Sequence, residues 1–363
     1  MSQTVRVPKF YVCWLQYAKA SGLFNKYFET GQGQFIGDSF IGVTPASGKT
    51  FIVDEDATDS DIGLGTEWVS FPDTSKMDFV GILGHNLATG RAMEAIGSDT
   101  IEPKLLVGNA PGENYQQASI TNEIVNATHS GNAFTPEYDG FTLAEVALGS
   151  STMNEGRVQF VIFNATGTEG FEHKIGSLML GKSYEMPHSP DLNLTMTIDH
   201  GGYNITETKA GHTLTNANWT SQPLWYGGLG AWELGQPGQD YTLQNKLRRS
   251  GRRIFDLNFS FIQKTDIFPD VMQNQWFGAN DTSNAPYSNN NLPEEDILLD
   301  SDTFYSKVFV PTFGMKLPFI MQIDKDNNSP DNFVIVRAVQ NSITLRQTAP
   351  NLYQVKLKLR ETW

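Results

Sequence analysis

The clearest pattern in this chain is a nearly perfect alternation of apolar and polar residues from Ile254 to Phe261. A period of two over that length predicts a β-strand with one buried face and one solvent face. Phe255, Leu257, Phe259 and Phe261 are expected on the buried face. The segment therefore predicts a half-buried strand in a larger sheet.

A cluster of arginines precedes this strand, at a turn that Gly251 breaks: Arg248, Arg249, Arg252 and Arg253. The whole chain has a net formal charge of −14, so such a concentration of positive charge indicates contact with an acidic surface. The nearest acidic surface is another copy of the chain. The four arginines are therefore predicted to lie at a subunit interface.

Other segments also have the composition and length of strands, and sustained helical periodicity is missing. The nearly continuous apolar run at 77–83 indicates a strand in the centre of a sheet. One short helix is expected at 270–277. The remaining strands are expected at 10–15, 51–53, 67–71, 157–163, 174–180, 192–198, 319–323, 333–339, 342–346 and 354–360. The sequence predicts an all-β fold.

The order of these segments predicts two β domains. Residues 1–45 form an N-terminal strand and arm, and 46–185 form a jelly roll or β-sandwich. Residues 186–363 form a second antiparallel β domain with long loops, of which the longest are expected at 201–245 and 278–292. Pro187 and Pro190 mark the boundary.

Composition narrows the classes of partner. An aromatic content of 12% with few charges and many turn residues fits an all-β protein. The acidic balance argues against nucleic acid as a partner. No run of eighteen apolar residues occurs, so no membrane span is expected. Cys13 is the single cysteine and cannot form an internal disulfide, which fits synthesis in a reducing cytoplasm.

No catalytic or metal-binding motif is found. The chain lacks a Gly-x-Ser-x-Gly elbow and a Walker loop, and its six histidines are dispersed. The acidic segments 54–61 and 324–329 lack the glycine and glutamate of a calcium loop. The first is interpreted as a solvated turn and the second as a hairpin turn between 319–323 and 333–336. We therefore expect no catalytic residue, no metal, no cofactor and no enzymatic activity.

Four aromatic residues lie close together between glycines: Trp219, Trp225, Tyr226 and Trp232. Exposed aromatic rings on loops stack on sugars, but they are also enriched at subunit contacts. The subunit contact is the favoured interpretation, and a glycan platform is the alternative.

Several short motifs, taken in order, resemble virion structural proteins of tailed bacteriophages. The segment 79–87 resembles a strand and turn of their discoidin-like jelly-roll units, and 174–181 looks like the closing strand of that unit. The segments 249–253 and 353–363 look like parts of tail and baseplate components. The motifs touch all but the first fifth of the chain.

The resemblance implies a structural component of the phage tail or baseplate, similar to a distal-tail or adaptor protein. Such a protein is made in the cytoplasm of the host bacterium and ends up in the virion. Its partners would be copies of itself, in a hexamer or trimer, and other virion tail proteins. The alternative is a carbohydrate-binding receptor-recognition protein of the tail, with a host surface glycan as its partner. A glycoside hydrolase is the least favoured of the three, since no pair of carboxylates stands out.

Overall fold

The computed structural model describes part of the chain, with gaps between the described segments. These segments are 6–20, 25–30, 51–52, 59–67, 78–85, 101–107, 119–125, 128–130, 133–135, 140–147, 155–163, 174–175, 177–199, 203–217, 252–269, 301–329 and 332–362.

The fold is mostly β, with one large antiparallel sheet and few short helices. Along the large sheet the strands follow the order β14 (Thr195–Asp199), β17 (Arg252–Gln263), β21 (Leu352–Glu361), β19 (Phe333–Ala338), β18 (Phe319–Gln322), β1 (Lys9–Cys13), β13 (Ser177–Glu185), β5 (Phe79–His85), β10 (Gly140–Ala147) and β7 (Ser119–Val125). A further strand, β20 (Thr344–Ala349), pairs with β21 outside this path.

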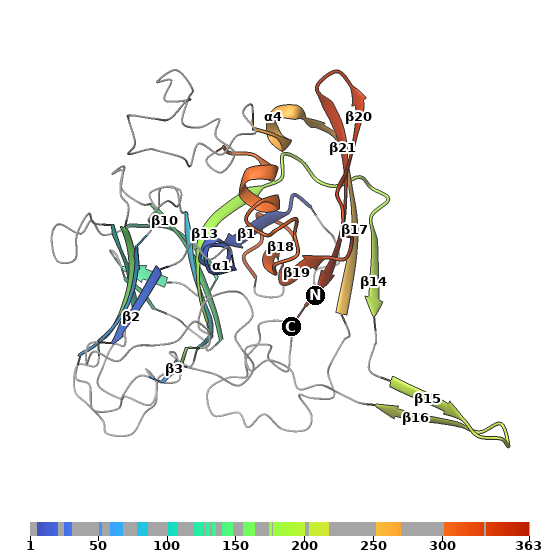
Figure 1. Cartoon of the computed structure of the whole chain (residues 1–363), viewed down its shortest axis with the longest axis horizontal. Coiled ribbons are helices and arrows are strands. Elements are labelled where there is room, and N and C mark those ends of the chain that lie inside the picture. Colours follow the sequence, from blue (N-terminus) through green and yellow to red (C-terminus); the bar gives the residue numbers. More distant parts are fainter. Residues whose placement is uncertain are drawn as a thin grey trace.

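Three smaller sheets accompany the large one. The six-stranded sheet consists of β2 (Asn25–Thr30), β4 (Asp59–Glu67), β11 (Glu155–Phe163), β6 (Ile101–Val107), β9 (Ala133–Thr135) and β8 (Thr128–Ser130). The two-stranded sheets pair β12 (Lys174–Ile175) with β3 (Phe51–Ile52), and β15 (Tyr203–Glu207) with β16 (Thr213–Ala217). Figure 1 shows β2 toward one end of the molecule, the hairpin of β15 and β16 at the opposite end, and β1, β18, β17 and β21 between them.

The helices are short and lie next to the large sheet. Those in the described segments are α1 (Trp14–Ala20), α4 (Lys264–Ile267) and the π-helix η4 (Tyr305–Phe309). Figure 1 shows β1, β18 and β19 close to the helical segment around η4. The buried side chains of that segment, Ser306 and Val308, therefore face the strands rather than solvent.

The core is centred on β1, which is buried on both faces. Phe10 packs edge-on against Phe304 and Phe319, with ring centroids 6.2 and 5.8 Å apart. Its neighbour Tyr11, on the opposite face, meets Phe79 at 5.2 Å and Phe333 at 6.4 Å. Successive residues of a strand point to opposite faces, so β1 joins two aromatic clusters. Burial of such rings provides most of the stabilising free energy of a core.

Several strand predictions are confirmed. The alternating segment forms β17, and residues 79–83 of the apolar run at 77–83 lie in β5, between β13 and β10 in the large sheet. The expected hairpin of 319–323 and 333–336 is present as β18 and β19, which pair antiparallel. The large sheet takes strands from both sides of residue 186, because β1 lies between β13 and β18. The domain division stays a prediction.

The strand predicted at 10–15 and the turn predicted at 54–61 were each wrong in part. The strand expected at 10–15 ends at Cys13, and a helix begins at Trp14. Leu, Gln, Ala and Lys in that helix are good helix formers, and a short apolar run alone does not distinguish a strand from a helix. Within the segment 54–61, residues 59–61 belong to strand β4 rather than to a turn.

Two further corrections concern the chain after residue 190. The strand expected at 192–198 begins only at Thr195, and Leu192 and Ile198 are exposed. Leu192 lies in a turn before the strand, and β14 is the terminal strand of the sheet, where Met196 still packs against the core. The loop expected at 201–245 contains the hairpin of β15 and β16. The expected helix at 270–277 and loop at 278–292 lie outside the described residues.

Candidate functional site

The predicted interface arginines divide into two groups. Arg248 and Arg249 lie outside the described residues, while Arg252 and Arg253 are the first two residues of β17 rather than part of a turn. Arg252 is partly exposed and lies opposite Asp199 of β14. The interface role of the four arginines stays a prediction.

Arg253 has a partner inside the chain. Its Nη2 donates to Glu361 Oε1 at 3.1 Å and its backbone N–H donates to Glu361 Oε2 at 2.9 Å. The exposed fractions of the two side chains are 6% and 4%. Side chains two positions apart in a strand lie on the same face, so Arg253 shares the buried face of β17 with Phe255. The alternation in the sequence therefore already indicated that Arg253 is buried. A buried arginine here requires the paired carboxylate.

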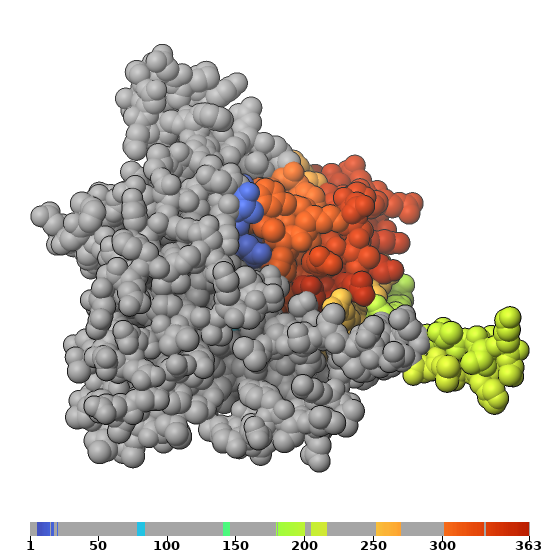
Figure 2. All heavy atoms as spheres, turned by 60° about the horizontal axis from the view of Figure 1, so that its bottom comes forward, coloured from blue at the N-terminus to red at the C-terminus, as the bar shows by residue number. Residues whose placement is uncertain are grey.

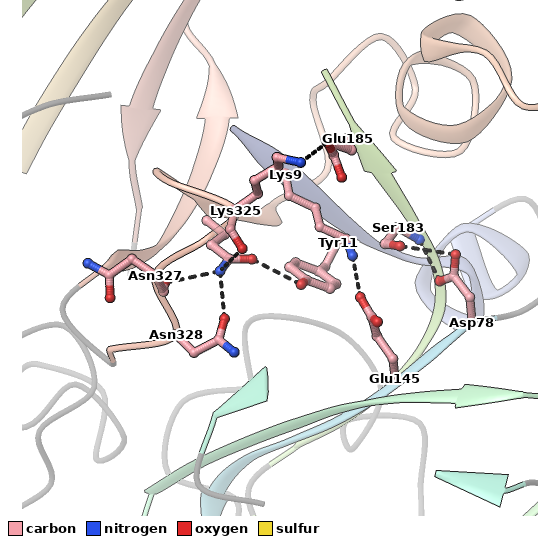
Figure 3. A network of polar contacts seen from close by, with 10 residues as sticks. Lys9, Tyr11, Asp78, Glu145, Ser183, Glu185, Lys325, Asn327 and Asn328 are labelled. Atoms are coloured by element: carbon pink, nitrogen blue, oxygen red, sulfur yellow. Dashed lines mark hydrogen bonds and ion pairs between the residues drawn. The ribbon is translucent and has the colours of Figure 1, made fainter. Parts of the chain in front are cut away.

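A second group of polar side chains joins β1 to its neighbours, as Figure 3 shows. The Tyr11 hydroxyl donates to Gln322 Oε1 at 3.1 Å. The amide of Gln322 donates in turn to the Asn327 carbonyl and to Asn328 Oδ1, both at 3.0 Å. These bonds tie the hairpin turn after β18 to the central strand.

Ion pairs extend this group to both sides of β1. Lys9 contacts Glu145 of β10, and Lys325 contacts Glu185 of β13 at 2.6 Å. Close to β13, Asp78 accepts from the backbone N–H of Ser183 at 2.6 Å and from its hydroxyl at 3.0 Å. The contacts link β1, β10, β13 and β18, so we interpret the group as structural.

Burial changes the acid–base properties of this group. Desolvation raises the pKa of the Asp78 carboxyl above its ordinary value, although nearby Lys307 and the bonds from Ser183 act in the opposite direction. Burial also raises the pKa of the Tyr11 and Tyr184 hydroxyls. Both tyrosines therefore stay neutral in the folded protein and serve as hydrogen-bond donors.

The hairpin of β15 and β16, which we call the hairpin arm (residues 203–217), projects from the body. Figures 1 and 2 show it extending away from the remaining described strands. Its turn is well formed: Gly211 N–H donates to the Thr208 carbonyl at 2.9 Å, and His212 N–H donates to Thr208 Oγ1 at 3.0 Å. Gly211 has a φ of 80°, which glycine adopts without strain. The turn sequence thus specifies the arm.

Among the described side chains of the arm, a large apolar residue is exposed on each face. Ile205 is 70% exposed and Leu214 is 59% exposed. Ile205 lies opposite Thr215, and Leu214 lies opposite Thr206. Since Ile205 and Thr206 are consecutive, the two apolar side chains point to opposite faces of the hairpin. A partner that covers both must surround the arm.

The remaining predicted sites cannot be placed. Trp219, Trp225, Tyr226 and Trp232 lie outside the described residues, so both interpretations of this aromatic group stay predictions. Within the described segments, no cluster of three or more His, Cys, Asp or Glu side chains is arranged to hold a metal ion. None of the helices in those segments has the length and apolar character needed to cross a membrane.

Sequence reasoning missed the basic side chains of the last strand. Val355, Leu357 and Leu359 are buried, while Lys356 and Lys358 between them are exposed. The same alternation that identified β17 is present here, and it would have placed the lysines together on the solvent face.

No protein-family model, curated protein or solved structure matches the chain.

Proposed function

We propose that this chain is a structural component of a bacteriophage tail or baseplate, which assembles as a homo-oligomeric ring and docks other virion proteins. The resemblance of the segments 79–87, 174–181, 249–253 and 353–363 to such proteins supports the class. In this proposal, residues 46–185 form an outward-facing jelly roll and 186–363 build the ring. The protein acts by assembly and not by catalysis.

The observation that carries the proposal is the hairpin arm. A two-stranded hairpin alone is at best marginally stable in water. This arm pairs only within itself among the described residues, yet it exposes Ile205 and Leu214 on opposite faces. A neighbouring copy that surrounds the arm supplies the missing apolar contacts.

A ring follows from the geometry of such a contact. The arm of one copy and its receiving surface on the next are different parts of the chain. Contacts of this head-to-tail type close into rings when the rotation between copies allows. The strand β14, which precedes the arm in the chain, pairs only with β17 among the described strands and exposes Ile198 at 40%, so it offers a further strand edge.

Replacement of the two apolar side chains of the arm tests the proposal. The variant with both Ile205→Ser and Leu214→Ser is expected to have the mass of a monomer in light scattering, whereas the unmodified chain has the mass of a closed oligomer. Lys209→Ser, in the exposed turn of the same arm, is the matched control and is expected to assemble normally. At protein concentrations low enough for all three to be monomeric, their unfolding midpoints should be the same, because these side chains lie outside the core. A double variant that assembles like the unmodified chain would contradict the proposal.

A further inference from the structure

The solvent face around β21 has a strong excess of positive charge in an acidic chain. We call it the basic face, and its members are Arg337, Arg346, Lys356, Lys358 and Arg360. The strand register places them together. Lys358 lies opposite Asp256, Arg360 lies opposite Arg337, and Gln354, next along the same face, lies opposite Arg346.

Most of these cations are not neutralised within the described part of the chain. Arg360 pairs with Asp199 at 2.5 Å. No salt bridge connects Arg337, Arg346, Lys356 or Lys358 with a carboxylate among the described residues. Like charges on directly opposed residues, as with Arg337 and Arg360, destabilise a sheet. The arrangement therefore favours contact with an anionic partner over a role in folding.

An exposed aromatic ring lies in the same region. Phe261 is 69% exposed, whereas the alternation predicted it on the buried face with Phe255, Leu257 and Phe259. The register shows the reason: Phe259 lies opposite Val355 and Ile262 opposite Tyr353, so two residues of β17 face Gln354 alone. This β-bulge changes the side to which Phe261 points.

The backbone at this bulge is strained. Phe261 has a φ of 65°, in the left-handed region that bulky residues avoid. Asp191 holds the bulge in place, since it accepts from the Ser260 hydroxyl at 2.8 Å and contacts the Asn258 amide. Strain of this kind persists only where the surroundings enforce it, and it is concentrated at functional sites.

We infer that Phe261 and the basic face form a docking surface for the acidic surface of a second copy of this chain. This inference rests on the proposed function and names a second contact of the ring. An exposed aromatic residue flanked by cations is typical of the residues that dominate protein interfaces.

Charge complementarity identifies the second copy as the partner. The chain has a net charge of −14, so cations gathered on one face leave the remaining surface still more acidic. Nucleic acid also attracts cations, but here Asp256 and Asp199 lie among them and the rest of the chain repels a polyanion. The second copy accounts for both the basic face and the acidic remainder.

Two variants of the full chain test the inference, each with a matched control. Phe261→Asn is expected to weaken self-association by about tenfold or more. Its unfolding midpoint should not fall, because asparagine tolerates the left-handed region. The control is Phe313→Asn, which changes another exposed phenylalanine, with a φ of 51°. Lys356→Glu should weaken association by about tenfold at low salt and less at high salt. Its control is Lys264→Glu, the same charge change on an exposed lysine of α4.

Analytical sedimentation measures the self-association of the unmodified chain, the two variants and their controls over a range of salt concentrations. Association weakened by both variants and by neither control supports the inference. If the unmodified chain associates and both variants associate equally well, the docking surface is wrong while the ring proposal stands. If the unmodified chain is monomeric throughout, both are wrong. Normal association of Lys356→Glu, with loss of binding to a short DNA duplex that the unmodified chain binds, would identify nucleic acid instead and overturn the inference.

Discussion

In the centre of the large sheet, β1 has a hydrogen-bonded strand on each edge and aromatic side chains on both faces. Among the described strands, those of the hairpin arm pair only with each other. Both are short antiparallel segments with well-defined register. The difference lies in what covers them. The centre is complete within one chain, and we propose that the arm is completed by the next copy. Global stability should therefore depend on the centre and assembly on the arm.

The largest expected effect distinguishes two glycines. A Cβ on Gly181 of β13 would lie 1.9 Å from the Val12 carbonyl oxygen, a backbone atom of β1. Gly181→Ala should therefore destabilise the fold by about 5 kcal/mol or more, near the total stability of many domains. Chemical denaturation measures the change.

The control is Gly211→Ala in the turn of the arm. Apart from its two chain neighbours, no described residue has a heavy atom within 4 Å of its Cβ position, so the positive φ is what opposes the change. The expected cost is about 1 kcal/mol, confined to the arm, with the global midpoint unchanged. Equal effects of the two substitutions would remove the distinction between centre and arm.

A buried ion pair should come next in effect. Glu361→Leu leaves the Arg253 guanidinium buried without its carboxylate, at an expected cost of about 3–5 kcal/mol in the free energy of unfolding. The measurement is again denaturation at neutral pH. A loss below about 1 kcal/mol would show that the arginine reaches solvent when its partner is removed.

Asp78 should make stability depend on pH near the centre of the sheet. Burial raises its folded pKa above the ordinary value of 3.8, so the folded state binds this proton more tightly than the unfolded state. Its contribution to stability is fully present below the ordinary pKa, declines as pH rises through the raised folded pKa, and is constant above it. The unfolding free energy of the native protein relative to that of Asp78→Asn should therefore decline as pH rises from the ordinary pKa of 3.8 to the raised pKa of the folded state.

The check on Asp78 is the difference in unfolding free energy between the native protein and Asp78→Asn, measured at a series of acidic pH values. Asp326→Asn, an exposed carboxyl in the hairpin turn after β18, serves as the matched control. A difference that stays flat, or that grows in favour of the native protein as pH rises, contradicts the expectation.

The smallest effect is expected for the exposed ion pair at the edge of the sheet. Arg360 and Asp199 are 35% and 36% exposed, so solvent screens their attraction. Arg360→Met should cost about 0–1 kcal/mol, and less in high salt. Thermal unfolding at two salt concentrations measures it. A cost similar to that of Glu361→Leu would contradict the expectation that the buried ion pair contributes more to stability than the exposed one.

The sequence predicted the centre better than the periphery, for a physical reason. Apolar runs and alternation record which side chains are buried, so they identified β5, β17 and the β18–β19 hairpin. The same signal failed at Leu192, which lies in a turn before β14, and at Phe261, since alternation does not show where a strand begins or where a bulge shifts the register. The arm was missed because its strands are rich in threonine and lack a buried face.

For the interaction surfaces, the sequence indicated the chemistry but not the position. The positive charge before β17 was recognised, yet Arg253 is buried against Glu361. The exposed cations of β21 were not recognised. Pairing between residues more than a hundred positions apart decides which arginine is buried, and a single sequence does not contain that pairing.

Amide hydrogen exchange, measured on the full chain at high and low protein concentration, tests the central claim most directly. We expect amides of β15 and β16 to be protected at high concentration and to lose protection on dilution, while those of β1 and β18 stay protected throughout. Protection of the arm that is the same at both concentrations would contradict the claim that a second copy completes it.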